Sequence, residues 1–242
     1  MKILVIGNGA REHALVKKLI GESFVDGVIC APGNAGIERE HSTRVVPLNI
    51  SDAEAILSVA EAQAVDMTVI GPELPLANGV ADLFLTHGRF LFGPSKSAAR
   101  LESSKSFAKS FMARHGIPTA SFEICQNYEQ ALDLIRGDRF GASVVIKADG
   151  LAGGKGVTVA EDKKTAESAI RDAMVERRFG DAGTSLVLEE CLTGPEVSYF
   201  VITDGTRFIS LPPAQDHKRA FDNDAGPNTG GMGAFAPSPL LT

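Results

Sequence analysis

Short apolar runs and longer amphipathic segments alternate through the first hundred residues of the chain. The runs are continuous and rich in β-branched residues, as in KILVIG at residues 2–7, which is typical of strands buried on both faces of a sheet. The segments between them carry apolar residues at helical spacing, as at Ala14, Leu15 and Leu19. The expected strands are 2–7, 25–30, 43–47, 67–71 and 90–93, and the expected helices are 11–20, 53–64 and 78–87. This alternation predicts a doubly wound parallel-sheet α/β domain over residues 1–100.

The pattern changes after Gly93-Pro94-Ser95, which marks a natural domain boundary. One long helix is expected over residues 98–115, ended by Gly116-Ile117-Pro118. Shorter elements follow it, and the expected ones are strands 121–125, 143–148, 157–160 and 185–190 and helices 128–136 and 164–175. Residues 101–242 are therefore expected to form an α+β domain with antiparallel strands.

The last fifty residues carry less regular patterns. Residues 196–203 and 207–211 can pair as a hairpin over Asp204-Gly205, a favoured turn sequence. Residues 212–242 are rich in Gly, Pro, Asp and Asn and show little periodicity. Such a run is either a disordered tail or an ordered functional loop.

Composition narrows the class of protein. The chain has 242 residues, 44% of them hydrophobic and 22% charged, which is typical of soluble globular proteins. A net charge of -6 argues against a general nucleic-acid binder, although it leaves room for local basic pockets. Cys30, Cys125 and Cys191 lack the spacing of a zinc or redox site, so we expect reduced packing residues. No segment has the pattern of a signal peptide or a membrane span, so a cytoplasmic protein without membrane or nucleic-acid partners is expected.

The first candidate site is the turn between the first strand and the first helix, GNGAREH at residues 7–13. Backbone N–H groups at a helix start can hold a phosphate, and the glycine spacing approaches a dinucleotide fingerprint. Glu12 replaces the third glycine, however, and Ala31-Pro32 stands where an NAD enzyme would carry an acidic residue. A phosphate or sugar-phosphate site is the preferred interpretation; a tight turn without ligand and an NAD site are the alternatives.

The second candidate site is the loop GLAGGKG at residues 150–156, which joins two strands. Its backbone amides could close over phosphates, and Lys155 supplies positive charge. The spacing is not that of a Walker loop, and the simpler interpretation is a flexible hairpin turn. Lys147 adds weight to a phosphate site, because a lysine at the end of an apolar strand is costly to bury without an anion.

The third candidate site is VLEECLTGPEVS at residues 187–198. Backbone groups in such a connector can bind an adenine edge, and a carboxylate can accept from ribose hydroxyls. Glu189 and Glu190 could equally be a solvated strand end, the commoner meaning of two adjacent acids. Glu196, at a turn before an apolar strand, is the stronger candidate.

The fourth candidate site lies within residues 215–233, where charged, amide and glycine residues are concentrated. Lys218 and Arg219 suit an anionic substrate, whereas Asp216 and Asp224 suit an amine. The simpler interpretation is a disordered tail.

Taken in order, these stretches resemble the phosphoribosylamine–glycine ligase family of purine biosynthesis, also called glycinamide ribonucleotide synthetases. The motifs that carry the resemblance span essentially the whole chain and are residues 7–14, 32–36 (PGNAG), 71–76 (GPELPL), 147–156 (KADGLAGGKG) and 216–233. Five motifs in register are more specific than any one of them. The resemblance implies a pre-ATP-grasp domain at residues 1–100 and an ATP-grasp domain at residues 101–242, with a small lid subdomain at about 121–191.

The resemblance also implies a reaction and a set of site residues. ATP would phosphorylate the glycine carboxylate, and the amine of 5-phosphoribosylamine would displace the phosphate; Mg²⁺ or Mn²⁺ would assist. The residues implied are Lys105, Lys147, Leu151, Gly153, Gly154, Lys155, Gly156, Glu189, Leu192 and Glu196 at the nucleotide, Gly9, Asn34, Glu73 and Asp216 at the substrates, and Lys218 and Arg219 as catalytic groups. Lys105 by itself is an ordinary helix-surface lysine in the sequence, and only the resemblance singles it out. Catalysis of this kind relies on positioning, cations and oriented amides.

The resemblance has a limit at the end of the chain. Family members continue well beyond Thr242, and the later part carries the acidic and amide residues that hold the metal. No metal ligand is therefore expected in this stretch, the ATP-grasp domain is expected to be incomplete, and we expect these 242 residues alone not to ligate glycine. Another purine-pathway ATP-grasp ligase, or a non-catalytic nucleotide-binding fragment, is the alternative function. The sequence leaves the oligomeric state open.

Overall fold

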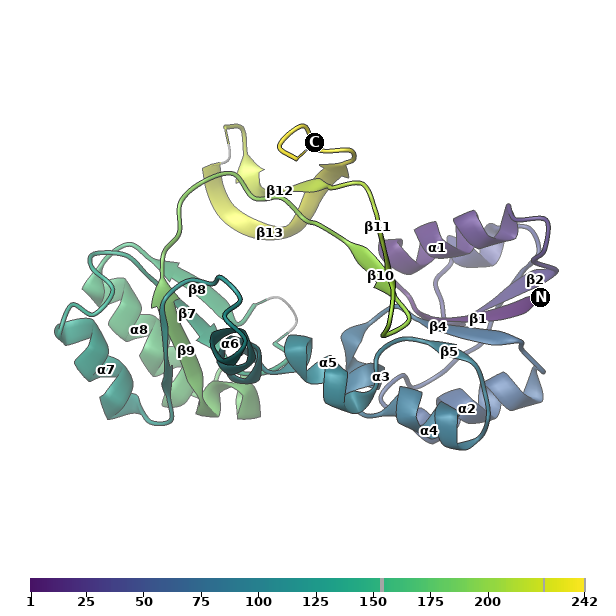
Figure 1. Ribbon diagram of the computed structural model, residues 1–242, viewed down its shortest axis with the longest axis horizontal. Coiled ribbons are helices and arrows are strands. Elements are labelled where there is room, and N and C mark those ends of the chain that lie inside the picture. The colour runs from purple at the N-terminus through teal and green to yellow at the C-terminus, as the bar shows by residue number, and fades with distance from the viewer. Residues whose placement is uncertain (153–154, 224, 242) are drawn as a thin grey trace. The chain divides into compact units, whose positions relative to one another are not determined.

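The computed structural model describes residues 1–152, 155–223 and 225–241, which form two compact units, Met1–Glu190 and Cys191–Thr242. The larger unit contains a parallel sheet and an antiparallel sheet, each covered by helices (Figure 1). The smaller unit contains two hairpins. The expected mixed α/β fold is confirmed.

The first sheet has five parallel strands in the order β3-β2-β1-β4-β5. Its elements in chain order are β1 Lys2–Gly7, α1 Ala10–Ile20, β2 Gly27–Pro32, η1 Ile37–Arg39, β3 Thr43–Val45, α2 Ala53–Ala62, β4 Met67–Ile70, α3 Glu73–Ala77, α4 Val80–Thr86 and β5 Leu91–Phe92. Helix α3 and the short helix η1 occupy segments for which no element was predicted, because five and three residues are too few to show a helical period. The other elements match the predicted ones within a few residues.

Both faces of this sheet are buried. On one face, Val16 of α1 packs with Val5 and Val28. On the other face, Ile56 of α2 and Phe84 of α4 pack against neighbouring strand residues. Helices therefore cover each side, as Figure 1 shows for α1 on one side and α2 and α4 on the other. Burial on two faces explains why β1 is a continuous apolar run.

The helix expected at residues 98–115 is in fact two helices, α5 Lys96–Ser103 and α6 Lys105–Arg114. The break lies at Ser104, whose backbone is extended, with φ −136° and ψ 112°. The Ser104 hydroxyl accepts a hydrogen bond from the Phe107 N–H at 3.2 Å and so caps α6. The prediction of one helix was wrong because it rested on the spacing of apolar residues. That spacing does not reveal a capping residue such as Ser104, which ends one helix and starts the next.

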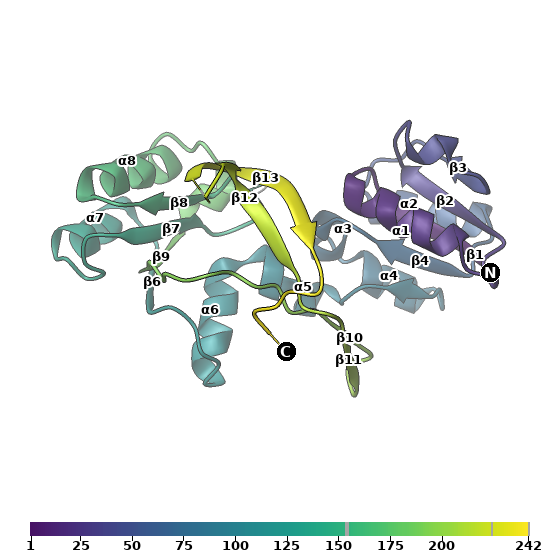
Figure 2. The ribbon, with the colours of Figure 1, turned by 90° about the horizontal axis from the view of Figure 1, so that it is seen from above.

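The second sheet has four antiparallel strands in the order β6-β9-β7-β8. Its elements are β6 Phe122–Cys125, α7 Tyr128–Arg136, β7 Val144–Ala148, β8 Val157–Ala160, α8 Lys163–Met174, η2 Gly180–Thr184 and β9 Leu186–Glu190. Helices α7 and α8, labelled in Figure 2, pack on one face of this sheet. There Ile135 and Ile170 contact the same core as Ile146 and Leu188. The opposite face of β7 and β9 carries the charged residues described below.

The smaller unit consists of two antiparallel hairpins, one of β10 Val201–Thr203 with β11 Phe208–Ser210 and one of β12 Gln215–Phe221 with β13 Ala225–Phe235. The first is the expected hairpin, with shorter strands. The second lies in the segment for which a disordered tail and an ordered loop were both considered, and the structure gives it regular strands. In the part of the chain that the structure describes, no helix is long and apolar enough to cross a bilayer.

The three cysteines differ in exposure, and this predicts their reactivity. Burial raises the pKa of Cys30 and of Cys125 to about 11, whereas Cys191 is only half-buried. Since the thiolate is the reactive form, we expect one fast-reacting thiol, Cys191, when the native protein meets a disulfide reagent at pH 8. Denaturation should release all three. Rapid labelling of Cys30 or Cys125 in the native protein, located by mass spectrometry, would contradict the packing described here.

Candidate functional site

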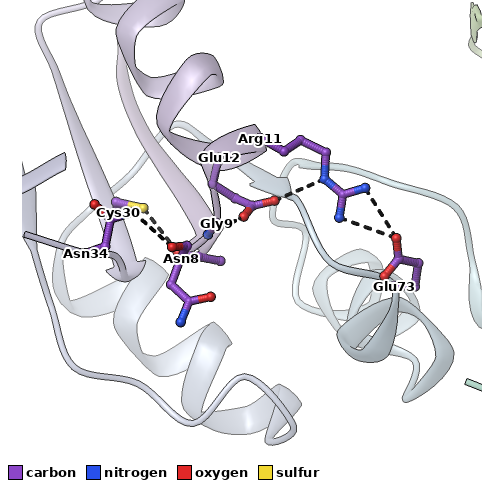
Figure 3. A network of polar contacts seen from close by, with 8 residues as sticks. Asn8, Gly9, Arg11, Glu12, Cys30, Asn34 and Glu73 are labelled. Atoms are coloured by element: carbon purple, nitrogen blue, oxygen red, sulfur yellow. Dashed lines mark hydrogen bonds and ion pairs between the residues drawn. The ribbon is translucent and has the colours of Figure 1, made fainter. Parts of the chain in front are cut away.

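The turn between β1 and α1 is built around the carboxylate of Glu12, which is 4% exposed. Its Oε2 accepts a hydrogen bond from the Gly9 N–H at 2.7 Å, and its Oε1 lies 3.3 Å from Nε of Arg11 (Figure 3). The protein's own carboxylate therefore caps the start of α1, where backbone N–H groups carry partial positive charge.

Glycines from two strand ends and the helix start make room for this carboxylate. A Cβ added at Gly7 would lie 2.5 Å from Cγ of Glu12, and one added at Gly71 would lie 2.2 Å from Oε1. Gly7 also has φ +131°, which other residues rarely adopt. Since Glu12 fills the space and supplies negative charge, the geometry argues against a pyrophosphate at this turn, and it weakens the case for a simple phosphate site there.

Three residues implied as substrate contacts, Gly9, Asn34 and Glu73, come together around this turn (Figure 3). Asn34 donates from Nδ2 to the Asn8 carbonyl at 2.9 Å. Glu73, at the start of α3, accepts from the Arg11 guanidinium at 3.3 Å. Three segments that are distant in sequence thus meet at the carboxyl end of the parallel sheet, where ligands bind in open α/β folds.

The glycine-rich loop follows β7 and begins beside the helix break. Nζ of Lys105, the first residue of α6, donates to the Gly150 carbonyl at 2.9 Å. Burial lowers the pKa of Lys105, and the carboxylates of Asp149 and Glu102 oppose that shift. Lys105 is therefore not the ordinary surface lysine that its position in the sequence suggested.

The remaining loop residues are only partly described. Gly153 and Gly154 lie outside the described residues. Leu151 and Lys155 are exposed, and the Gly156 carbonyl accepts from the Ala148 N–H at 2.8 Å. The described residues thus place the two ends of the loop together beside β7.

Asp149 ties the helix break to the start of this loop. Its Oδ1 accepts from the Ser104 hydroxyl at 3.0 Å and from the Ser106 N–H at 3.1 Å, and its Oδ2 accepts from the Ser106 hydroxyl. The candidate residues inferred from sequence did not include Asp149, although the motif KADG contains it. Its partners lie more than forty residues earlier, so no local pattern could identify them.

We expect Asp149→Asn to lower the free energy of unfolding by about 1–3 kcal/mol, because an amide supplies one acceptor oxygen for three donors. Urea denaturation measures the change, and faster hydrogen exchange at the Ser106 amide should accompany it. Asp133→Asn is the matched control, since Asp133 is exposed on α7. Equal costs for the two substitutions would mean that Asp149 does not hold the helix break.

Glu189 forms a charge cluster with two lysines on the face of the antiparallel sheet opposite α7 and α8. Its Oε1 pairs with Nζ of Lys147 on β7, and its Oε2 pairs with Nζ of Lys109 on α6. Glu189 is 3% exposed, so the interpretation of a solvated strand end was wrong for this residue. The anion that a buried Lys147 was expected to need is present, and it is Glu189. Lys109 was missed because nothing in its helix pattern marks it.

Other predicted site residues meet in the smaller unit. Nζ of Lys218 donates to Oε2 of Glu196 at 2.7 Å and lies 3.8 Å from Oδ2 of Asp216. The hydrogen bond with Glu196 is the main cause that raises the pKa of Lys218. Arg219 donates to the Gly226 carbonyl at 2.7 Å, and Leu192 is exposed.

Two further expectations concern Asp224 and the metal. Asp224, considered as an amine contact, lies outside the described residues. Among residues 1–152, 155–223 and 225–241, no three His, Cys, Asp or Glu side chains gather as a metal site would require.

Comparison with known proteins identifies the family. A model described as the N domain of phosphoribosylglycinamide synthetase matches residues 1–102, and one described as its ATP-grasp (A) domain matches residues 103–242. The chain belongs to the phosphoribosylglycinamide synthetase family. The resemblance inferred from the motifs is thereby confirmed.

Relatives within this family are closely similar over the whole chain. The phosphoribosylamine–glycine ligase of Xylella fastidiosa is 50% identical over all 242 residues, and that of Escherichia coli is 48% identical. In each case the match covers 100% of this chain and 56% of the relative. The chain thus spans about half the length of the curated relatives it matches.

Solved structures support the same assignment. The phosphoribosylamine–glycine ligase of Thermotoga maritima superposes with a TM-score of 0.80 at 34% identity, over 98% of this chain and 56% of that one. The biotin carboxylase domain of the Hydrogenobacter thermophilus 2-oxoglutarate carboxylase, solved with MgADP, gives a TM-score of 0.73 at 22% identity. That match covers 100% of this chain and 54% of the other, and at such low identity it shows a shared fold alone.

Proposed function

We propose that this chain supplies the substrate-side domain and part of the ATP-grasp domain of a phosphoribosylamine–glycine ligase. The reaction joins glycine to 5-phosphoribosylamine by way of glycyl phosphate and gives glycinamide ribonucleotide, ADP and phosphate. The single observation that carries the proposal is the family match over residues 1–102 and 103–242. The domain division is proposed at about residue 100, between the last strand of the parallel sheet and α6, with the lid subdomain at about 121–191.

The nucleotide is proposed to bind beside β7 and the glycine-rich loop. Lys105 and Lys147 would bind its phosphates, since Lys105 contacts Gly150 at the start of this loop and Lys147 lies near the end of the strand before it. The loop residues proposed to close over the phosphates are Leu151, Gly153, Gly154, Lys155 and Gly156. Cations and backbone amides suit a polyphosphate, so the residues present fit ATP as a substrate.

The adenosine end is proposed to lie near residues 189–196. Leu192 and Glu196 would contact the adenine and ribose. We propose that Glu189 contributes through its backbone and through Lys147, because both oxygens of its side chain already pair with lysines. This refines the role in adenine or ribose binding implied for that side chain by the family resemblance.

The amine and carboxylate substrates are proposed to bind through Gly9, Asn34, Glu73 and Asp216, with Lys218 and Arg219 as the catalytic groups. Two cationic side chains can stabilise the negative charge that develops as phosphate leaves the acyl group. Mg²⁺, or Mn²⁺ in its place, would neutralise phosphate charge. No ligand set for the metal occurs among the described residues, so none is assigned here.

Calorimetric titration with ADP in the presence of magnesium tests the nucleotide part of the proposal. We expect saturable binding, and about tenfold weaker binding after Lys147→Met, which corresponds to about 1.4 kcal/mol. Lys164→Met on α8 is the control for loss of a distant positive charge. Absence of binding by the unsubstituted chain would refute the nucleotide site.

A substrate panel tests the choice among ligases. The protein to test is a full-length member of the family in which these 242 residues form the matching part. It should release phosphate from ATP in the presence of glycine and phosphoribosylamine, and it should release less phosphate when another carboxylate replaces glycine. Preference for formate or bicarbonate would instead favour the alternative, another ATP-grasp ligase of purine synthesis.

A further inference from the structure

The charge cluster of Lys109, Lys147 and Glu189 lies on one face of the antiparallel sheet because strand residues alternate between faces. Leu186 and Leu188 of β9 point into the apolar core with α7 and α8, so Glu189 points to the other face. Val145 of β7 pairs with Glu189, which makes Lys147 a diagonal neighbour on the same face.

The ammonium group of Lys109 is held by the protein on every side. Beyond Glu189, it donates to the Thr119 hydroxyl at 2.7 Å and to the Ala120 carbonyl at 3.5 Å, and it lies 5.5 Å from the centroid of the Phe122 ring. The residue is 7% exposed. Lys109 therefore has a full set of partners and little access to a ligand.

Lys147 differs from Lys109 in exposure, although it shares the same carboxylate. Its side chain is 29% exposed, whereas that of Lys109 is 9% exposed. Two ammonium groups and one carboxylate carry a net charge of +1. Since Lys109 is enclosed, the excess positive charge of the cluster is accessible only through Lys147.

We propose that Lys109 is a positioning residue that keeps the charge of Lys147 available to a nucleotide polyphosphate. Without Lys109, the buried Glu189 would neutralise Lys147 completely, and the cluster would present no net charge to a phosphate. With Lys109 in place, one oxygen of the Glu189 carboxylate pairs with this lysine on α6. The pairing fixes the orientation of the carboxylate, so its other oxygen stays in place for Lys147. This inference rests on the nucleotide site proposed above, which is tested separately on the unsubstituted chain.

A purely structural role for Lys109 predicts something different. In that case Lys109→Met would weaken nucleotide binding only by loosening the fold, so any variant that circular dichroism shows to be fully folded would bind as tightly as the unsubstituted chain. The charge argument instead predicts that folded Lys109→Met binds more weakly and that the second substitution restores binding. Lys109→Met combined with Glu189→Gln removes one charge of each sign, so the net charge returns to +1.

The experiment is a calorimetric titration of four proteins with ADP and magnesium: the unsubstituted chain, Lys109→Met, the double variant Lys109→Met/Glu189→Gln, and Lys163→Met. Lys163 is the matched control because it lies on the surface. Among the described residues, its only ion pair is the exposed one with Asp138 at 3.4 Å. We expect about tenfold weaker binding for Lys109→Met, as the loss of one nearby charge at intermediate dielectric implies. The double variant should bind within about threefold of the unsubstituted chain, and Lys163→Met should be unchanged.

Each outcome decides a different point. If the unsubstituted chain does not bind ADP, the proposed nucleotide site fails and this inference fails with it. If that chain binds but Lys109→Met binds equally well, or the double variant stays as weak as the single one, the inference alone is overturned. Circular dichroism checks folding; should Lys109→Met not fold, the double variant decides, since retained affinity supports the charge argument and lost affinity refutes it.

Discussion

Replacing Glu189 with glutamine is expected to lower the free energy of unfolding by about 3–5 kcal/mol, the largest effect we expect from a single substitution. The substitution keeps the shape of the side chain and removes its charge. Lys109 would then be an enclosed cation with no counter-ion, and an unpaired buried charge is among the most destabilising features a protein can carry. Urea denaturation followed by circular dichroism measures the effect.

Two further variants show whether charge is the cause. Glu190→Gln is the control on the adjacent residue. Among the described residues, the carboxylate of Glu190 accepts only from the Ser121 hydroxyl, at 2.9 Å, and Glu190 is partly exposed, so its cost should stay below about 1 kcal/mol. Adding Lys109→Met to Glu189→Gln should recover much of the lost stability, since both members of the pair are then neutral. Similar costs for Glu189→Gln and Glu190→Gln would show that the cluster is not a buried ion pair in solution.

Replacing Gly71 with alanine should lower the free energy of unfolding by about 2–3 kcal/mol through overpacking. The added methyl group would lie 2.2 Å from Oε1 and 2.6 Å from Cγ of Glu12. A carboxylate at the end of a side chain can often move aside. This one is confined by Gly7 and Gly9 and holds the Gly9 N–H, so movement breaks the cap of α1.

A double-mutant cycle with Glu12→Ala separates this clash from other effects. Once the Glu12 side chain is gone, Gly71→Ala should cost less than about 1 kcal/mol, so the two substitutions should be strongly non-additive. Gly21→Ala is the control, because its φ is −81° and its added Cβ would come no nearer than 3.4 Å to the Lys18 carbonyl. Additive costs for Gly71→Ala and Glu12→Ala would show that the carboxylate does not occupy the space beside Gly7, Gly9 and Gly71.

Hydrophobic periodicity predicted most of the fold because it is a local signal. Each strand of the parallel sheet is a short apolar run, and α7, at Tyr128–Arg136, was predicted to the residue. The break at Ser104 was missed because it depends on a capping hydroxyl and on Asp149, which is 45 residues away. Interactions over such separations leave no periodic trace in the sequence.

The candidate site was predicted less completely, and the reason is again distance along the chain. Motifs in register identified the family and directed attention to Lys105, Lys147 and Glu189. The local pattern around Glu189 did not indicate that its side chain would be buried, because burial of an acid depends on cations supplied by other elements. Lys109 on α6 and Lys147 on β7 supply them, and only the fold brings the three together.

The two unlike faces of β9 have a consequence for how the chain avoids misfolding. Shifting β9 by one residue against β7 would turn Glu189 toward Ile146 and the helices and would bring Leu188 to the lysines. Such a slip would bury an unpaired carboxylate in an apolar layer and leave two cations without a counter-charge. The cluster therefore penalises the wrong alignment more heavily than an apolar residue at position 189 would, and it serves as a safeguard of strand register during folding.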